Sequence, residues 1–122
     1  SIIRGNYSMP PSHGAAIVRT ILADAALRQN WEDELHVMRG RIHTLRAQFV
    51  ETLKAHGVEQ DFEFITRQKG MFSYLGITTD QVARLRADFG IYIAPPSRIN
   101  VAGMNDDNLS YLVNSLKTVL QA

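Results

Sequence analysis

The sequence predicts an α+β fold in which helices cover a small sheet and a long helix leads into it. The main observation is a change of hydrophobic period at Gly57. Before this glycine, apolar residues recur at the spacing of one helix face, whereas after it they alternate with polar residues, as in a half-buried strand. Further short apolar runs and helical stripes follow in the second half of the chain. This order favours a two-layer module of sheet and helices.

A long, regular helix is predicted over residues 30–57. Asn30 suits the N-cap, and Gly57 suits the end because glycine adopts a left-handed conformation at little cost. About 26 residues with a rise of 1.5 Å each form a rod of roughly 39 Å, so we expect this helix to bridge two bodies. Its apolar residues alternate steps of four and three, which keeps them on one face. They are Trp31, Leu35, Met38, Ile42, Leu45, Phe49 and Leu53.

A shorter helix is predicted before the long one. Pro10 and Pro11 keep the preceding residues out of helical geometry, because proline restricts both its own backbone and that of the residue before it. The helix then begins at Pro11 or Ser12. A break near Gln29 and Asn30 is expected to separate the two helices.

Short strands are predicted after Gly57, at residues 61–65, 71–75, 91–94 and 98–102. The first contains alternating phenylalanines, and the second is apolar enough to be more deeply buried. Pro95-Pro96 ends the third strand, because proline cannot donate to a ladder.

Two helices are predicted among these strands. Thr78 followed by Gln81 is the pattern of a capping box, and Gly90 is a natural end for the helix that starts there. Asn105 suits the cap of the last helix, whose apolar residues form one stripe up to Leu120.

Composition excludes several classes of function. The 122 residues carry a net charge of +1, which gives no electrostatic reason to expect a nucleic acid or an anionic membrane as partner. Cysteine is absent, so disulfides and thiolate chemistry are excluded. No apolar run approaches the roughly 20 residues that cross a bilayer.

No familiar catalytic or metal-binding set is present. His36 and His43 share a helix face, but a third ligand is missing, so a solvated face is the better interpretation and we expect no metal site. The carboxylates are scattered or lie in first helical turns, where capping explains them. No glycine-rich phosphate loop is found.

Two arginines lie in contexts that suit binding. Arg98 follows Pro95-Pro96-Ser97 and opens a strand, where a rigid turn could direct its guanidinium at a carboxylate. Arg4 lies in an irregular segment punctuated by glycine and proline. From spacing alone, an ordinary surface arginine in an ion pair is the more probable interpretation of each.

Three stretches together resemble the C-terminal part of the aspartate and aromatic amino-acid aminotransferases, which are class I pyridoxal-phosphate enzymes of fold type I. They are RGNYSMPPSHG at residues 4–14, KGMFSYLG at 69–76 and SRINVAG at 97–103. Their order and separations also fit the family, and the resemblance covers essentially the whole chain.

The resemblance implies a domain organisation. Residues 1–29 are expected to end the large domain, residues 30–57 to form the linking helix, and residues 58–122 to form the small C-terminal domain. The fold is then an α+β small domain of a fold-type I aminotransferase, and the long helix is the one that joins the two domains.

The resemblance also implies roles for individual residues. Arg98 is expected to bind the α-carboxylate of the substrate, and Phe72 to lie close to it. Arg4 is expected to reach the active site of the neighbouring subunit of a homodimer and to bind the side-chain carboxylate of dicarboxylic substrates. Ser8 is expected beside that intersubunit contact. Met9 and Ser97 depart from the family pattern, which usually has asparagine and glycine at these positions.

The implied activity is transfer of an amino group between an aspartate or aromatic amino acid and 2-oxoglutarate, in the cytoplasm. The cofactor is pyridoxal 5′-phosphate, but its Schiff-base lysine belongs upstream of Ser1 in this family. Lys54, Lys69 and Lys117 match no such motif, so no catalytic or cofactor-binding residue is expected here and this segment alone is expected to be inactive. Preference for aspartate or aromatic substrates stays open.

A rival interpretation is a stand-alone, non-catalytic α+β module for binding or dimerisation. The stripe from Trp31 to Leu53 would then be a dimerisation surface. Arg4 argues against it, because a free-standing module has no evident use for an arginine and two prolines at its start.

Overall fold

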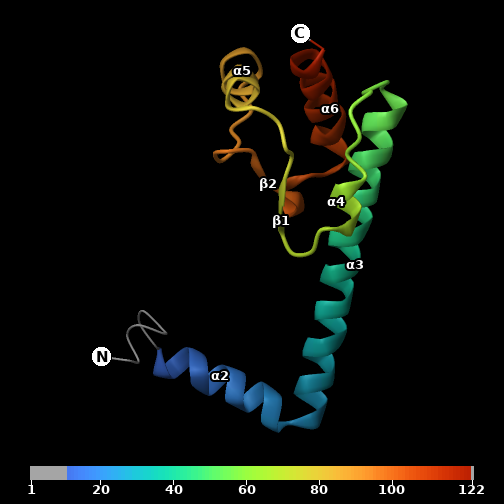
Figure 1. Cartoon of the computed structure of the whole chain (residues 1–122). Helices are drawn as coiled ribbons and strands as arrows, with labels where there is room; N and C mark the ends of the chain where they lie inside the picture. The colour runs from blue at the N-terminus through green and yellow to red at the C-terminus, as the bar shows by residue number, and fades with distance from the viewer. Residues whose placement is uncertain (1–10, 122) are drawn as a thin grey trace. The chain divides into compact units, whose positions relative to one another are not determined.

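The computed structural model describes residues 11–121, which form two compact units divided between Arg39 and Gly40. The predicted site residues Arg4 and Ser8, and the departure at Met9, lie outside the described residues. Figure 1 labels the α-helices and the strands. In chain order the elements are α2 (Ser12–Ala23), α3 (Ala25–Ala55), α4 (Phe64–Arg67), β1 (Phe72–Tyr74), α5 (Thr79–Phe89), β2 (Arg98–Asn100), the 3₁₀ turn η1 (Val101–Gly103) and α6 (Asp106–Leu120).

The first unit contains α2 and the beginning of α3. Helix α2 starts directly after Pro11, whose carbonyl accepts from the N–H of Ala15 at 3.1 Å, as the paired prolines predict. The predicted break at Gln29 and Asn30 is wrong. Asp24 is the true break, because its Oδ1 accepts from the N–H groups of the second and third residues of α3, each at 2.9 Å. An aspartate therefore caps α3 six residues before the predicted asparagine.

The end of α3 agrees with the prediction. Gly57 has a φ of +75°, and its N–H donates to the carbonyl of Lys54 at 3.0 Å. The N–H of Val58 donates to the carbonyl of Leu53 at 3.1 Å, which completes a Schellman closure. This left-handed residue ends α3 and turns the chain toward α4.

The apolar stripe of α3 has two different environments. In the second unit Leu45, Phe49 and Leu53 are buried, with Phe49 fully inaccessible. In the first unit Trp31, Leu35 and Met38 are exposed to 41%, 40% and 55%. The stripe is therefore continuous in sequence, whereas only its second half contributes to a core.

The core of the second unit combines α3, α4, the strands, α5 and α6 (Figure 1). Helices α5 and α6 contact each other, and the Tyr111 hydroxyl of α6 donates to the carbonyl of Phe89 at the end of α5 at 2.7 Å. The largest fully buried apolar side chains are Phe49, Leu53, Phe62, Ile65, Leu75, Leu85 and Leu116.

The sheet has two antiparallel strands, β1 and β2, with Ser73 opposite Ile99 and Tyr74 opposite Arg98. The predicted strands 71–75 and 98–102 are therefore confirmed in shorter form. The second is shorter because the Asn100 side chain accepts from the N–H of Ala102 at 3.1 Å and bends the chain into η1.

The other two predicted strands are wrong. Residues 61–65 contain the start of helix α4, because Asp61 Oδ1 accepts from the N–H of Glu63 at 2.8 Å and turns the chain. Residues 91–94 form no strand, and only Ala94 makes an isolated bridge, to Arg98. In residues 61–65, the alternation of apolar and polar residues is too short to distinguish a strand from a turn with buried phenylalanines.

The two predicted helix caps are confirmed. The side chains of Thr78 and Gln81 form the reciprocal capping box of α5, and Gly90 ends that helix with a φ of +64°. Asn105 and Asn108 form a second capping box at α6. The α+β prediction therefore holds, with helices dominant over a two-stranded sheet.

None of the described helices combines the length and the apolar character needed to cross a membrane, although α3 contains 31 residues.

Candidate functional site

The site is centred on the exposed face of the β1–β2 ribbon. Side chains alternate along each strand, so that the middle residues Ser73 and Ile99 are buried and their neighbours face outward. Arg98 is directly opposite Tyr74 and diagonal to Phe72. Its guanidinium carbon lies 4.9 Å from the centre of the Phe72 ring. The ladder therefore brings together the two site residues predicted within the described part of the chain.

The ring of Phe72 gives the Arg98 guanidinium a surface to lie on without neutralising its charge. A cation near the face of an aromatic ring is attracted by the ring quadrupole, while the planar fork keeps its N–H donors. Phe72 is 50% exposed, so the pair is open to a ligand. A carboxylate is the group that matches such a fork bidentately.

The ion-pair interpretation of Arg98 is wrong for the described residues. Between residues 11 and 121 the ion pairs are Arg28–Glu32, Lys54–Glu63 and Arg84–Asp88. Arg98 has no carboxylate within 4.0 Å in that part of the chain. Its charge is therefore available to an anion from elsewhere.

The backbone around Arg98 is held from two sides. Its N–H donates to the carbonyl of Ala94 at 2.8 Å, which closes the turn through Pro95 and Pro96.

Ser97 is only 3% exposed, and its hydroxyl accepts from the N–H of Gly76 at 3.2 Å. The carbonyl of Ser97 accepts from the N–H of Leu75 at 3.0 Å. The residue that replaces the expected glycine thus anchors this turn to the chain beyond β1.

A cavity of about 360 Å³ adjoins Arg98. Its polar lining includes Asn100, Asn108 and Tyr111, and Arg98 is the one charged residue among the described side chains that line it. The cavity therefore offers hydrogen-bonding groups beside a single positive charge.

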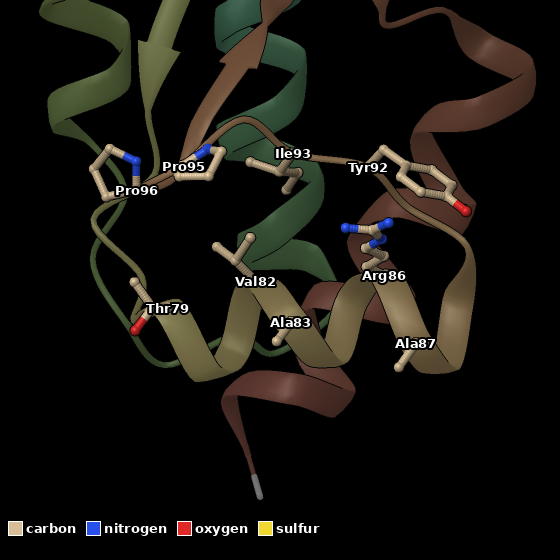
Figure 2. Close-up of a pocket in the computed structure, with 9 residues that line it drawn as sticks. All are labelled: Thr79, Val82, Ala83, Arg86, Ala87, Tyr92, Ile93, Pro95 and Pro96. Carbon is tan, nitrogen blue, oxygen red and sulfur yellow. The ribbon is translucent and has the colours of Figure 1, made fainter.

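A larger cavity of about 500 Å³ lies between α5 and residues 92–96 (Figure 2). Its lining is mainly apolar, and the Arg86 guanidinium carbon lies 5.2 Å from the centre of the Tyr92 ring. Neither Arg98 nor Phe72 lines this cavity. The larger of these two cavities therefore contains neither of the predicted binding residues.

Sequence reasoning missed one buried cation, Arg46 of α3, which is 1% exposed. Its guanidinium donates to acceptors in the segment from Ile65 to Ser73, including the carbonyl of Phe72. A signal was present, because Arg46 lies one turn from both Ile42 and Val50 on the buried side of the helix. A lone charge among apolar helix positions calls for a partner.

The histidines form no site in the described residues. No group of three or more His, Cys, Asp or Glu side chains there could hold a metal ion. His36 and His43 are both exposed, and His36 Nδ1 lies 3.0 Å from an Arg39 nitrogen.

Comparison with known proteins agrees with the resemblance. A family model described as aminotransferase class I and II matches residues 1–116. The aspartate aminotransferase of Haemophilus influenzae is 55% identical over 120 residues, which is 98% of this chain and 30% of the relative. The aromatic-amino-acid aminotransferase of Escherichia coli is 39% identical over 118 residues, which is 97% of this chain and 30% of the relative.

Solved structures agree as well. The aromatic-amino-acid aminotransferase from Burkholderia pseudomallei, covalently bound to pyridoxal phosphate, has a TM-score of 0.87 and 52% identity, and the match covers 98% of this chain and 30% of that one. The chain thus spans about 30% of the length of these relatives. It belongs to the class I and II aminotransferase family.

Proposed function

We propose that this chain is the C-terminal part of a pyridoxal-phosphate aminotransferase that transfers an amino group between an aspartate or aromatic amino acid and 2-oxoglutarate. Within that enzyme, Arg98 binds the α-carboxylate of the substrate and Phe72 forms the adjacent wall. The observation that carries this proposal is the exposed guanidinium of Arg98, stacked 4.9 Å from the Phe72 ring, with no carboxylate of the described residues beside it. The names of the similar proteins support the same substrate classes.

The surroundings of the three lysines support the expectation that the Schiff-base lysine of the enzyme belongs upstream of this chain. Lys54 Nζ is bound to Glu63 Oε2 at 2.6 Å, Lys69 is exposed at the surface, and Lys117 lies on α6, which packs against α5. None of them lines the cavity beside Arg98. In this proposal, residues of the longer protein hold pyridoxal phosphate, and this chain binds and orients the carboxylate end of the substrate.

Several parts of the proposal concern the longer protein. Arg4 binds the side-chain carboxylate of a dicarboxylic substrate across a homodimer interface, with Ser8 beside that contact. Residues 1–29, 30–57 and 58–122 are the end of the large domain, the linking helix and the small domain. The enzyme works in the cytoplasm. The exposed stripe at Trp31, Leu35 and Met38 supports this organisation, because a linking helix needs apolar surface for a second body.

The test is Arg98→Ala in the full-length protein. Loss of two charge-assisted hydrogen bonds, at about 1.5–3 kcal/mol each, lowers kcat/KM for aspartate and phenylalanine by about 10²- to 10⁴-fold. Arg41→Ala is the matched control, because Arg41 is an exposed arginine of α3. An Arg98→Ala enzyme with unchanged kcat/KM would overturn the proposal.

The same assay also tests the alternative that the chain is a stand-alone module for binding or dimerisation. A stand-alone dimerisation module has the same exposed stripe but no transaminase activity with either amino acid. Activity of the full-length protein that depends on Arg98 excludes that alternative.

A further inference from the structure

We propose that Arg46 is a positioning residue for the carboxylate site: from inside the core it fixes β1 and the loop before it, and so sets where Phe72 and Arg98 lie. This inference rests on the proposed function, because it concerns the geometry of that binding site. It assigns a role to a buried cation that does not itself reach the exposed face of the ribbon.

The hydrogen bonds of Arg46 converge on one short segment. Nη2 donates to the carbonyl of Gly70 at 2.6 Å and to that of Phe72 at 3.1 Å. Nη1 donates to the carbonyl of Ile65 at 3.2 Å and to the Ser73 hydroxyl. A single guanidinium therefore ties α4, the loop after it and β1 to the long helix.

The acceptors are all neutral, which is unusual for a buried charge. Arg46 is 1% exposed, and no carboxylate of the described residues pairs with it. Its Nε has no hydrogen-bond partner among residues 11–121. Burial lowers the pKa of Arg46 from its ordinary value, because the charged form is desolvated. An apolar side chain of similar length avoids this desolvation and can match such a group in stability. What an apolar side chain lacks is directed donors.

The fixed segment leads directly to the binding residues. The carbonyl of Phe72 points to Arg46, while its ring lies beneath the Arg98 guanidinium. The neighbouring carbonyl of Met71 accepts from the N–H of Val101 at 2.7 Å, and Tyr74 is opposite Arg98 in the ladder. Displacement of β1 therefore displaces the ring, the partner strand and the guanidinium together.

Arginine geometry is essential to this role. Lysine keeps the charge but has one nitrogen, which cannot reach acceptors spread along residues 65–73 in the way that a planar fork does. Methionine keeps the length and removes both charge and donors. The two replacements therefore separate charge from geometry.

The experiment compares Arg46→Lys, Arg46→Met and Arg41→Met in the full-length holoenzyme. The readouts are KM and kcat for the amino-acid substrate, competitive inhibition by succinate and by 3-indolepropionate, and the thermal midpoint. The second inhibitor has been crystallised with a related aromatic amino acid aminotransferase. These unreactive carboxylates report on binding geometry alone.

The expected result is a rise of about 10- to 100-fold in the KM and in the inhibition constant for both Arg46 variants, because small misplacements of a binding group cost that much. The change in kcat is smaller than the change in KM. Arg41→Met, on the exposed side of the same helix, leaves all constants unchanged.

Ser73→Ala keeps the inference testable if the Arg46 variants do not fold. It removes one acceptor and only one oxygen atom, and it raises the inhibition constants by about fivefold, which corresponds to one lost hydrogen bond of about 1 kcal/mol. Inhibition constants that stay unchanged in Ser73→Ala, or in a folded Arg46→Lys enzyme, overturn the inference.

Arg98→Ala distinguishes a failure of the proposed function from a failure of the positioning role of Arg46. If Arg98→Ala weakens the inhibitors but Arg46→Lys only lowers the thermal midpoint, the proposed function stands and the positioning role of Arg46 fails. If Arg98→Ala leaves the inhibitors unaffected, the proposed function fails and the inference fails with it.

Discussion

The two faces of the β1–β2 ribbon each involve one arginine, and the two are treated in opposite ways. On the outer face, Arg98 lies on an aromatic ring and has no hydrogen-bonded anion among the described residues. On the inner side, Arg46 is enclosed and donates to backbone carbonyls and a hydroxyl. The outer guanidinium has no carboxylate of the described residues beside it, whereas the inner one has most of its donors in hydrogen bonds. Two arginines in the same fold can therefore differ in role, because the number of hydrogen-bond acceptors near each guanidinium differs.

The largest effect is expected from Arg98→Lys in the full-length protein. Lysine keeps the positive charge but cannot form a bidentate pair, so kcat/KM falls by about 100-fold while the thermal midpoint stays unchanged. Steady-state kinetics and a melting curve on the same sample check both statements. A variant that loses stability instead would place Arg98 among the structural residues and break the contrast between the two faces.

The inner face is tested by Ile99→Ala. Ile99 is 8% exposed and lies next to Arg98 in β2 with its side chain on the opposite face. Truncation in the core costs about 2–5 kcal/mol, so the thermal midpoint falls clearly. The kcat/KM of the remaining folded enzyme changes far less than in Arg98→Lys. Equal losses of activity in the two variants would contradict the separation of faces.

Phe72→Leu sharpens the account of the outer face. The leucine keeps an apolar wall but removes the ring beneath Arg98, an interaction of about 0.5–1 kcal/mol at an exposed site. Because Phe72 is half exposed, the thermal midpoint changes little. The KM for the amino acid in the full-length protein rises by about two- to fivefold, measured by steady-state kinetics beside the parent enzyme.

Ser97→Ala tests the anchor at the edge of the ribbon. The change leaves the Gly76 N–H without the hydroxyl acceptor that lies 3.2 Å away. Loss of this bond costs about 1 kcal/mol of stability, with a small rise in KM because the turn carrying Arg98 loosens. An unchanged midpoint would remove the anchoring role of Ser97.

The smallest effect concerns Lys54 and Glu63, an exposed ion pair. It contrasts with the buried Arg46, which has no carboxylate partner among the described residues. Hydrogen bonding to Lys54 lowers the pKa of Glu63, and hydrogen bonding to Glu63 raises the pKa of Lys54. The pair therefore stabilises the fold fully between about pH 5 and pH 10. Its contribution is lost as the pH falls through the lowered pKa of Glu63, or rises through the raised pKa of Lys54.

Glu63→Gln measures this contribution. The difference in urea midpoint between the two proteins is expected to be small and constant near neutral pH, since exposed pairs contribute little. Below about pH 4 the difference shrinks, because Glu63 is then protonated in the parent as well. A difference that grows in acid would contradict the assigned pKa direction.

The sequence predicted what local chemistry determines. Several helix ends were predicted correctly, because each depends on residues within a few positions. They are the capping box at Thr78, the left-handed glycines at Gly57 and Gly90, and the Asn105 cap. The long helix was predicted at its end but not at its start. Asn30 and Asp24 are both good caps, and only the structure distinguishes the one that accepts from the helix N–H groups.

Long-range features were beyond the sequence. The strand predicted over residues 61–65 failed because alternating phenylalanines are equally satisfied by one helical turn over a core. The pairing of Arg98 with Phe72 was implied only by the family resemblance, since periodicity gives no register between two strands far apart in the chain. Arg46 was missed because its acceptors lie 19 to 27 residues away.

The division of the α3 stripe has a spectroscopic consequence. The chain has one tryptophan, Trp31, and it lies in the exposed half of the stripe with 41% of its surface accessible. Its fluorescence therefore reports whether the first unit is covered, with a blue shift when the indole is shielded from water. The core around Phe49 contains no indole, so its melting is followed by circular dichroism instead.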